Sequence, residues 1–422
     1  MARLPARLKV PVIVALVLVL VGAGAVIFSS SGDAGDGGHL ARNRAQLKRA
    51  CGGLLPYGEL RDLVPDDVRG EVRAYGTQLT PGEESRTLLS CEVTWPDRGR
   101  VEVRAAPVLS RLPEPVTLEA AELVASAGVD ADYEAPGVTG RSGEAAVTWL
   151  VAECPAGLGT RARDVSAMYV TATVDRFGAG ARKLGAQARA LREFRTAVEV
   201  ANALTKAQKC GGEAIVRPDK VIDTYEAEVT SDPDGGNIQV ERVDIPGLGA
   251  AKCRGLAKEF PGTWSVAGDL QESRLLSVCD ATQYDRKDSL VDPPDLDEGD
   301  VSALSAVSWA GPLGESVDAE YGRSGDSYGF RAGERTKELQ EGKPVELALW
   351  AGGQCAAGRT LHQVTVSLER DGYSRTLTER ERALFSRQAR KALDAYLADP
   401  GGWPRQQRCH DTEILGEVEG WR

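Results

Sequence analysis

The chain has 422 residues, a formal net charge of −11, 42% hydrophobic residues and 27% charged residues. This length predicts two or three domains, and the apolar fraction is sufficient for ordinary cores, which excludes a globally disordered or collagen-like chain. The acidic balance argues against a nucleic-acid partner, because such a protein needs a basic face to neutralise phosphate.

An uncharged apolar run at residues 10–28 is long enough to cross a bilayer as one helix. Three basic residues precede it and acidic residues follow it, so the positive-inside rule predicts a cytoplasmic tail at residues 1–9 and an extracellular remainder. The alternative is a signal peptide cleaved after Ala23–Ala25. The run is longer than most signal-peptide cores, which favours an uncleaved, single-pass anchor in the cell membrane. Residues 29–45, rich in Ser, Gly and Asp, predict a flexible stalk.

The chain has eight cysteines, and an even number in an exported protein predicts disulfide bonds. They are Cys51, Cys91, Cys154, Cys210, Cys253, Cys279, Cys355 and Cys409. There is no C-x2-C pair and no His at ligand spacing from a Cys, so neither a metal site nor a cofactor is expected.

Beyond the stalk, several short patterns occur twice in the same order. Trp149–Cys154 (WLVAEC) matches Trp350–Cys355 (WAGGQC), with the Trp five residues before the Cys in both. The other matched pairs are Val129–Tyr133 with Val317–Tyr321, Gly140–Gly143 with Gly322–Gly325, and Gln187–Arg189 with Gln388–Arg390. A shared order of this kind predicts an internal duplication. The expected parts are a first repeat (46–210), a connecting segment (211–252), a second repeat (253–409) and a C-terminal tail (410–422).

Each repeat would then contain four cysteines, for which three connectivities exist. Order along the chain favours bonds from first to second and from third to fourth. One ambiguity stays open, because Cys210-Gly-Gly also matches Cys51-Gly-Gly, so Cys210 could instead open the second repeat.

Hydrophobic periodicity predicts strands followed by a helix in each repeat, which is typical of an α+β fold with a mostly antiparallel sheet. Expected strands cover Leu88–Trp95, Val101–Val108, Ala145–Cys154, Val165–Val174, Ala303–Trp309, Val345–Leu349 and Gln363–Leu368. Expected helices cover Leu54–Val64, Arg182–Lys209 and Glu379–Leu397, the last with Thr378 as its N-cap. The connecting segment contains two strand-like pieces, Tyr225–Val229 and Ile238–Val243, with a turn between them.

The segment that begins Cys51-Gly-Gly-Leu-Leu-Pro-Tyr-Gly-Glu-Leu and continues to Cys91-Glu-Val-Thr-Trp95 resembles exported actinobacterial envelope domains and lipoproteins of uncharacterised function. The resemblance covers about residues 51–108. It implies a small α+β domain in which Cys51 and Cys91 are bonded, and it brings no catalytic residues. The second repeat departs from the pattern at Cys253-Arg-Gly-Leu, and the chain lacks the lipobox Cys of the lipoprotein members.

One motif suggests catalysis: Gly325–Gly329 (GDSYG) matches the G-x-S-x-G sequence that holds a nucleophilic Ser in α/β-hydrolases. Acids and two later histidines, His362 and His410, could complete a triad with Ser327. The flanking residues do not predict the strand and helix that this motif requires, so a surface loop is favoured. Both histidines are expected at the surface.

For the other groups of polar and aromatic residues, a structural role is favoured over a functional one. The repeated GRSG, with Arg141 and Arg323, could bind an anion but is more typical of a turn. The carboxylates Asp130, Asp132, Asp318 and Glu320 could line a site or simply face solvent. The acidic run Asp292–Asp300 lacks the spacing of a calcium loop. Trp149 and Trp350 are expected in the core.

The sequence therefore predicts a membrane-anchored extracellular protein that binds, senses or scaffolds in the bacterial cell envelope and is not an enzyme. Its partners would be the membrane and an unidentified envelope ligand or protein, with no nucleic acid. The alternative hypothesis is a secreted serine hydrolase that uses Ser327.

Overall fold

The computed structural model describes residues 38–80, 87–108, 133–143, 147–159, 165–177, 185–223, 228–230, 239–241, 250–261, 264–268, 273–283, 301–321, 345–368 and 378–420. The expected cytoplasmic tail, the apolar run and residues 29–37 lie outside these ranges. Within them, no helix has both the length and the apolar character needed to cross a bilayer.

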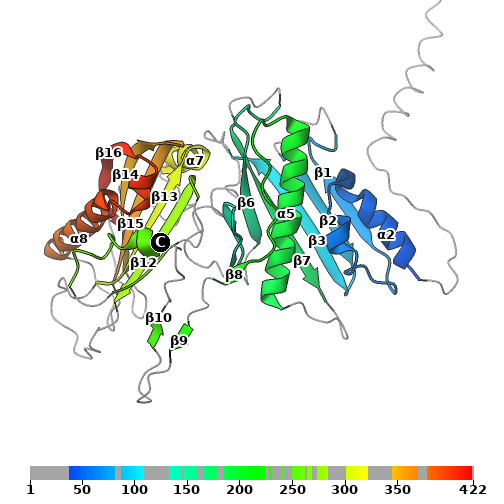
Figure 1. Ribbon diagram of the computed structural model, residues 1–422, viewed down its shortest axis with the longest axis horizontal. Helices are drawn as coiled ribbons and strands as arrows, with labels where there is room; N and C mark the ends of the chain where they lie inside the picture. The colour runs from blue at the N-terminus through cyan, green and yellow to red at the C-terminus, as the bar shows by residue number, and fades with distance from the viewer. Residues whose placement is uncertain are drawn as a thin grey trace, which may run out of the picture. The chain divides into compact units, whose positions relative to one another are not determined.

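The first half of the fold is a six-stranded sheet with one long helix packed on it (Figure 1). Its strands are β1 (Glu71–Tyr75), β2 (Leu89–Trp95), β3 (Gly99–Pro107), β5 (Gly140–Arg141), β6 (Thr148–Glu153) and β7 (Ala167–Arg176), in the order β1-β2-β3-β7-β6-β5. Its helices are α2 (Leu40–Arg49), the short 3-10 segment η2 (Ala50–Gly53), α3 (Tyr57–Leu60) and α5 (Ala186–Gln208). Strands β4 (Tyr133–Glu134) and β8 (Ile222–Asp223) form a separate small pair.

The second half has a sheet of the same size and again one long helix on it (Figure 1). Its strands are β11 (Trp264–Gly268), β12 (Leu276–Gln283), β13 (Val301–Ala310), β14 (Val345–Cys355), β15 (Gly358–Leu368) and β16 (His410–Gly420), in the order β11-β12-β13-β15-β14-β16. Its helices are α6 (Ala250–Cys253), α7 (Pro312–Tyr321), α8 (Glu379–Ala398) and α9 (Trp403–Gln406). Strands β9 (Glu228–Thr230) and β10 (Gln239–Glu241) pair between the halves.

Five strands follow the same order in both sheets, and every pairing among the described strands is antiparallel. The sixth strand of each sheet comes from a different part of its half. In the first half, β5 precedes β6 and pairs with it, whereas in the second half the C-terminal strand β16 pairs with β14. An α+β architecture with antiparallel sheets, expected from periodicity, is therefore confirmed.

The four disulfides join Cys51 to Cys91, Cys154 to Cys210, Cys253 to Cys279, and Cys355 to Cys409. All eight cysteines are paired, and every bond stays within one half. The favoured order, first to second and third to fourth, is confirmed. Cys210 closes the first half by bonding Cys154, which resolves the ambiguity over its role.

Side-chain alternation along the central strands places apolar residues on both faces of each sheet. On β7, Val170 and Ala172 face α5 and its core, while Ala167 and Tyr169 belong to a different cluster. That second cluster also contains residues of the second half, among them Trp309 stacked on Trp350 with ring centroids 5.7 Å apart. Residues 40–422 form one compact unit that includes both halves, and this shared cluster lies within it.

The structure corrects two of the expected segment limits. The stalk was expected to reach residue 45, but α2 begins at Leu40 because Leu47 is buried and Asn43 bonds backbone groups of Pro65, Val68 and Gly70. Residues 410–422 were expected as a tail, but β16 occupies residues 410–420 and completes the second sheet.

Helix and strand limits also differ in places. The helix expected over Leu54–Val64 is reduced to α3, because Pro56 precedes it and a turn follows Leu60. Strands β14 and β15 are longer than expected and meet in a tight turn, where Gly358 adopts a positive φ of 118°. Helix α7 covers Pro312–Tyr321, a segment in which neither a helix nor a strand was expected.

Candidate functional site

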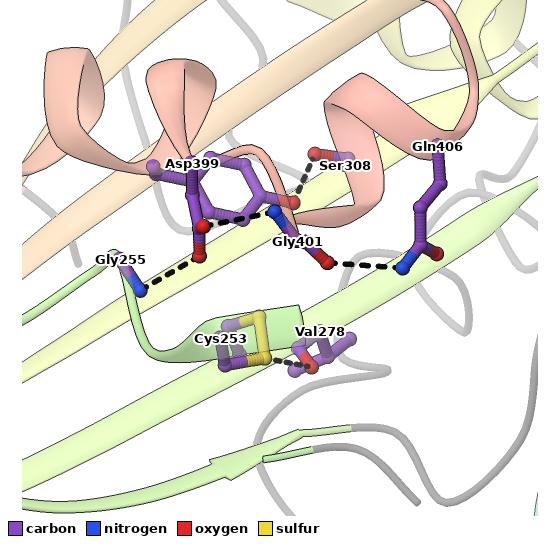
Figure 2. The surroundings of a disulfide bond; sticks show 9 residues. Cys253, Gly255, Val278, Ser308, Asp399, Gly401 and Gln406 are labelled. Atoms are coloured by element: carbon purple, nitrogen blue, oxygen red, sulfur yellow. Dashed lines mark hydrogen bonds between the residues drawn. A yellow bond between two sulfur atoms is a disulfide. The ribbon is translucent and has the colours of Figure 1, made fainter. Parts of the chain in front are cut away.

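Three polar side chains meet between the sheet and helix α8 of the second half. Ser308 lies on β13, His362 is its direct partner on β15, and Tyr396 comes from the last turns of α8. Ser308 Oγ is 2.7 Å from His362 Nδ1 and 2.8 Å from the Tyr396 hydroxyl. All three side chains are fully buried. We call Ser308, His362 and Tyr396 the buried polar cluster; Figure 2 shows Ser308 and its bond beside the end of α8.

Burial determines the charge of this cluster. Removal from water lowers the pKa of His362 to about 4, so the imidazole is neutral at pH 7. Its Nδ1 bonds Ser308, while its Nε2 is buried and has no hydrogen-bond partner. A Ser–His contact at this distance is also found in nucleophilic enzymes, where the His acts as base. Here neither side chain reaches the surface, so a substrate could not meet Ser308 unless the core opened.

In the described part of the first half, apolar side chains occupy the positions that match Ser308 and His362. Aligning the halves by the bonded cysteines of β2 and β12 places Ala105 at the position of Ser308, and Val170 at that of His362. Aligning the halves instead by Trp149 and Trp350, which precede the third cysteine of each half, again places Val170 at the position of His362. The second half therefore carries polar groups at core positions that are apolar in the first half.

A disulfide lies beside His362. A ring nitrogen of His362 and the sulfur atoms of Cys355 and Cys409 all lie within 4.8 Å of one another. Trp403 contacts the same histidine, with ring centroids 6.4 Å apart, and packs with Cys355 in a small apolar cluster. A histidine and two cysteines are ligands that zinc prefers, although the sulfurs cannot ligate while they are bonded to each other.

The first half has a different buried polar group, the carboxylate of Glu193 on α5. It accepts hydrogen bonds from Thr148 Oγ1 at 2.6 Å and from the Val174 backbone N–H at 2.9 Å. Burial raises the pKa of Glu193 to about 6, and these two donors only partly oppose that effect. The carboxylate joins α5 to β6 and β7, which indicates a structural role.

A surface groove of about 720 Å³ runs between α8 and the loop after α6. Asp399 joins the two sides, because its carboxylate accepts the backbone N–H of Gly255 at 2.9 Å (Figure 2). The same carboxylate accepts the backbone N–H of Gly401 at 3.0 Å on its own side of the groove. Four cationic side chains line the groove, with three acidic ones among them. The cationic residues are Lys258, Arg387, Arg390 and Lys391.

Most candidate residues from the sequence are structural or lie outside the described ranges. Ser327 and its G-x-S-x-G motif, Asp130, Asp132, Arg323 and the acidic run 292–300 all lie outside them. Arg141 is nearly buried and pairs with Glu134 at 3.3 Å, which explains its burial without an anion ligand. Asp318 pairs with Arg359 at 2.9 Å.

The two histidines differ from each other. His410 is exposed as expected and lies 2.8 Å from Asp411. His362 was expected at the surface, which is wrong: it lies inside β15, a strand buried on both faces. Trp149 and Trp350 are buried, in agreement with a core role. Sequence reasoning missed Ser308, Tyr396 and Glu193, because polar residues in amphipathic segments usually face solvent.

Comparison with known proteins gave no match: no family model, no curated protein and no solved structure is similar to this chain. The resemblance of residues 51–108 to exported envelope domains therefore stays a prediction, although the Cys51–Cys91 bond that it implies is present.

Proposed function

We propose that this protein is a non-catalytic binding, sensing or scaffolding module of the bacterial cell envelope, built from a duplicated α+β domain. The observation that carries the proposal is the cysteine pairing: every cysteine is bonded within its own half, at corresponding places in two sheets of like strand order. Disulfide bonds persist in oxidising compartments, which is consistent with an exported protein. Two similar units in one chain can each contact a partner, which favours a binding or scaffolding role.

Export through the apolar run 10–28 can be tested with reporter fusions. Alkaline phosphatase, which is active only after export, is joined after residue 45 in one fusion and after residue 9 in the other. We expect activity from the first fusion alone, and resistance of the intact chain to extraction from membranes by carbonate. Activity in neither fusion would contradict export, and a carbonate-soluble shortened chain would indicate a cleaved signal peptide.

The serine hydrolase hypothesis makes the opposite prediction for active-site labelling. A fluorophosphonate probe should leave the folded protein unlabelled if it is not a serine hydrolase. Two variants separate the candidate nucleophiles: Ser327→Ala removes the loop serine, and Ser308→Ala removes the serine of the buried polar cluster. Labelling of the native chain that disappears in either variant would overturn the non-catalytic proposal.

The groove along α8 is the binding face that we propose for an anionic ligand. Asp399 is engaged by backbone N–H groups and Asp394 lies 3.8 Å from Arg390. Lys258 and Arg387 are exposed cations of the groove, and Glu259 is its third acid. Fluorescent polyphosphate at low ionic strength is a suitable probe. The double variant Lys258→Glu with Arg387→Glu should bind several-fold more weakly, because it introduces like charges. Arg405 is exposed and lies outside the groove, so Arg405→Glu is the control. An equal loss of affinity in the double variant and in the control would exclude the groove as the binding site.

A further inference from the structure

We propose that reduction of the Cys355–Cys409 bond converts this pair, together with His362, into a binding site for a zinc ion. Among the described residues, these three side chains form a group whose ligand atoms lie within 4.8 Å of one another. Tetrahedral zinc has Zn–S distances of about 2.3 Å and Zn–N distances of about 2.0 Å, so neighbouring ligand atoms are roughly 3.5 Å apart. Breaking the bond would free the two sulfur atoms to separate to those distances, beside a histidine nitrogen that already lies within 4.8 Å of both.

The second, independent observation is the unsatisfied histidine nitrogen. His362 is fully buried, its Nδ1 is fixed by Ser308, and its Nε2 has no hydrogen-bond partner. Leaving a buried polar atom without a hydrogen bond is unfavourable, so the unpaired Nε2 of His362 needs an explanation. Metal-ligating histidines commonly have their other nitrogen held by a hydrogen bond, which is the arrangement that Ser308 and Tyr396 supply.

The first half provides an internal comparison. Its third and fourth cysteines form the corresponding bond, Cys154–Cys210, but Val170 stands where the second half has His362. A disulfide at this place therefore does not require a histidine beside it. The histidine is an additional feature of the second half, and the zinc site is the function we infer for it.

Accessibility favours selective reduction of this one bond. Seven of the eight cysteines are buried, and six of them are at most 2% exposed, whereas Cys355 is 8% exposed and Cys409 is only half-buried. An attacking thiolate must reach a sulfur atom, so Cys409 is the most accessible target among the four bonds.

The chemistry balances with a dithiol as the reductant. Attack on the Cys355–Cys409 bond transfers two electrons and two protons to the pair, and the dithiol becomes a disulfide. Zinc then displaces the proton of each thiol, so binding releases two protons and forms two Zn–S bonds. His362 contributes the third ligand as a neutral imidazole. A water molecule can take the fourth position, as in zinc sites with three protein ligands.

The test uses the full-length chain after mild treatment with a dithiol. Alkylation and mass mapping should first show that Cys355 and Cys409 are the free thiols. Titration with Co²⁺ as a spectroscopic substitute should then give thiolate charge-transfer bands and intense tetrahedral bands. Zn²⁺ should displace Co²⁺ at one ion per chain, and the fluorescence of Trp403 beside the site should change.

Matched variants distinguish a site from adventitious thiol binding. His362→Val, which copies the first half, should lower Zn²⁺ affinity by about ten-fold or more while both thiols stay available. Ser308→Ala should lower it less. Removal of the first-half pair by Cys154→Ser with Cys210→Ser should leave Zn²⁺ binding unchanged if circular dichroism shows a folded chain. Unchanged affinity in His362→Val, or another bond reduced first, would overturn the proposal.

Discussion

Glu193 shows how one buried residue can make the stability of the whole first half depend on pH. Its pKa is raised from 4.5 to about 6 by burial, so the folded state retains a proton that the unfolded state loses between these values. The stabilisation that the protonated Glu193 carboxyl contributes to the folded state is therefore complete below pH 4.5. It decreases as the pH rises to about 6, and above that the contribution no longer changes with pH. The loss is on the order of 2 kcal/mol.

The variant Glu193→Gln should lack this pH-dependent step, because the amide does not titrate. Urea unfolding at pH 4.5, 5.5 and 7 measures the effect in both proteins. The stability difference between native chain and variant should change by on the order of 2 kcal/mol across this range, in favour of the variant at high pH. Parallel pH profiles for the two proteins would mean that Glu193 has no raised pKa.

The buried polar cluster makes a second prediction at the residue scale. Ser308→Ala leaves His362 and Tyr396 without the hydroxyl that joins them, so it should destabilise the protein by about 1–3 kcal/mol. The further change His362→Val removes the imidazole that has lost its hydrogen-bond partner. The double variant then has the same residue pair as Ala105 and Val170 at the matching place in the first half.

The double variant should therefore lose less stability than the sum of the two single changes, by about 0.5–3 kcal/mol. Thermal unfolding of the native chain, both single variants and the double variant gives this coupling energy. Tyr396→Phe is a useful control, since it removes one hydroxyl and keeps the aromatic ring in the core. Additive losses would show that the residues do not act as a unit.

At the scale of single elements, the start of α8 depends on its capping box. Thr378 Oγ1 accepts the Glu381 backbone N–H at 3.3 Å, and the Glu381 carboxylate accepts the Thr378 backbone N–H at 2.8 Å. Thr378→Ala should lower the free energy of unfolding by about 1 kcal/mol. Helix α5 has Gly185 as its N-cap residue and so lacks a side-chain cap, and the space around Gly185 is open. Gly185→Ser should add a few tenths of a kcal/mol, and urea unfolding measures both changes.

The elements that the sequence predicted best are those with a strong local signal. Thr378 identified the start of α8, and alternation identified β2, β3 and β7 within two residues of their observed limits. The edge strand β16 could not be predicted in the same way, because its identity depends on pairing with the distant strand β14. Likewise, His362 looks like a surface residue until α8 covers β15.

At the scale of the whole molecule, the two halves have separate sets of disulfide bonds but share one apolar cluster. No disulfide crosses between them. The shared cluster contains Trp149 and Tyr169 from one half and Trp309 and Trp350 from the other. Thr139 Oγ1 also lies 2.9 Å from Ser273 Oγ, and Arg274 pairs with Glu153. Hydrophobic burial of this kind holds the two halves together without a disulfide bond between them.

A chain cut between the halves distinguishes these two kinds of connection. A protease site inserted at residues 231–238, between β9 and β10, allows a single cut in the folded protein. Because the apolar cluster is shared, the two fragments should elute together in size-exclusion chromatography under native conditions. Because no bond crosses between them, they should separate in denaturant without any reductant. Fragments that stay joined in denaturant would reveal a disulfide between the halves, whereas fragments that part under native conditions would show that the shared cluster contributes little.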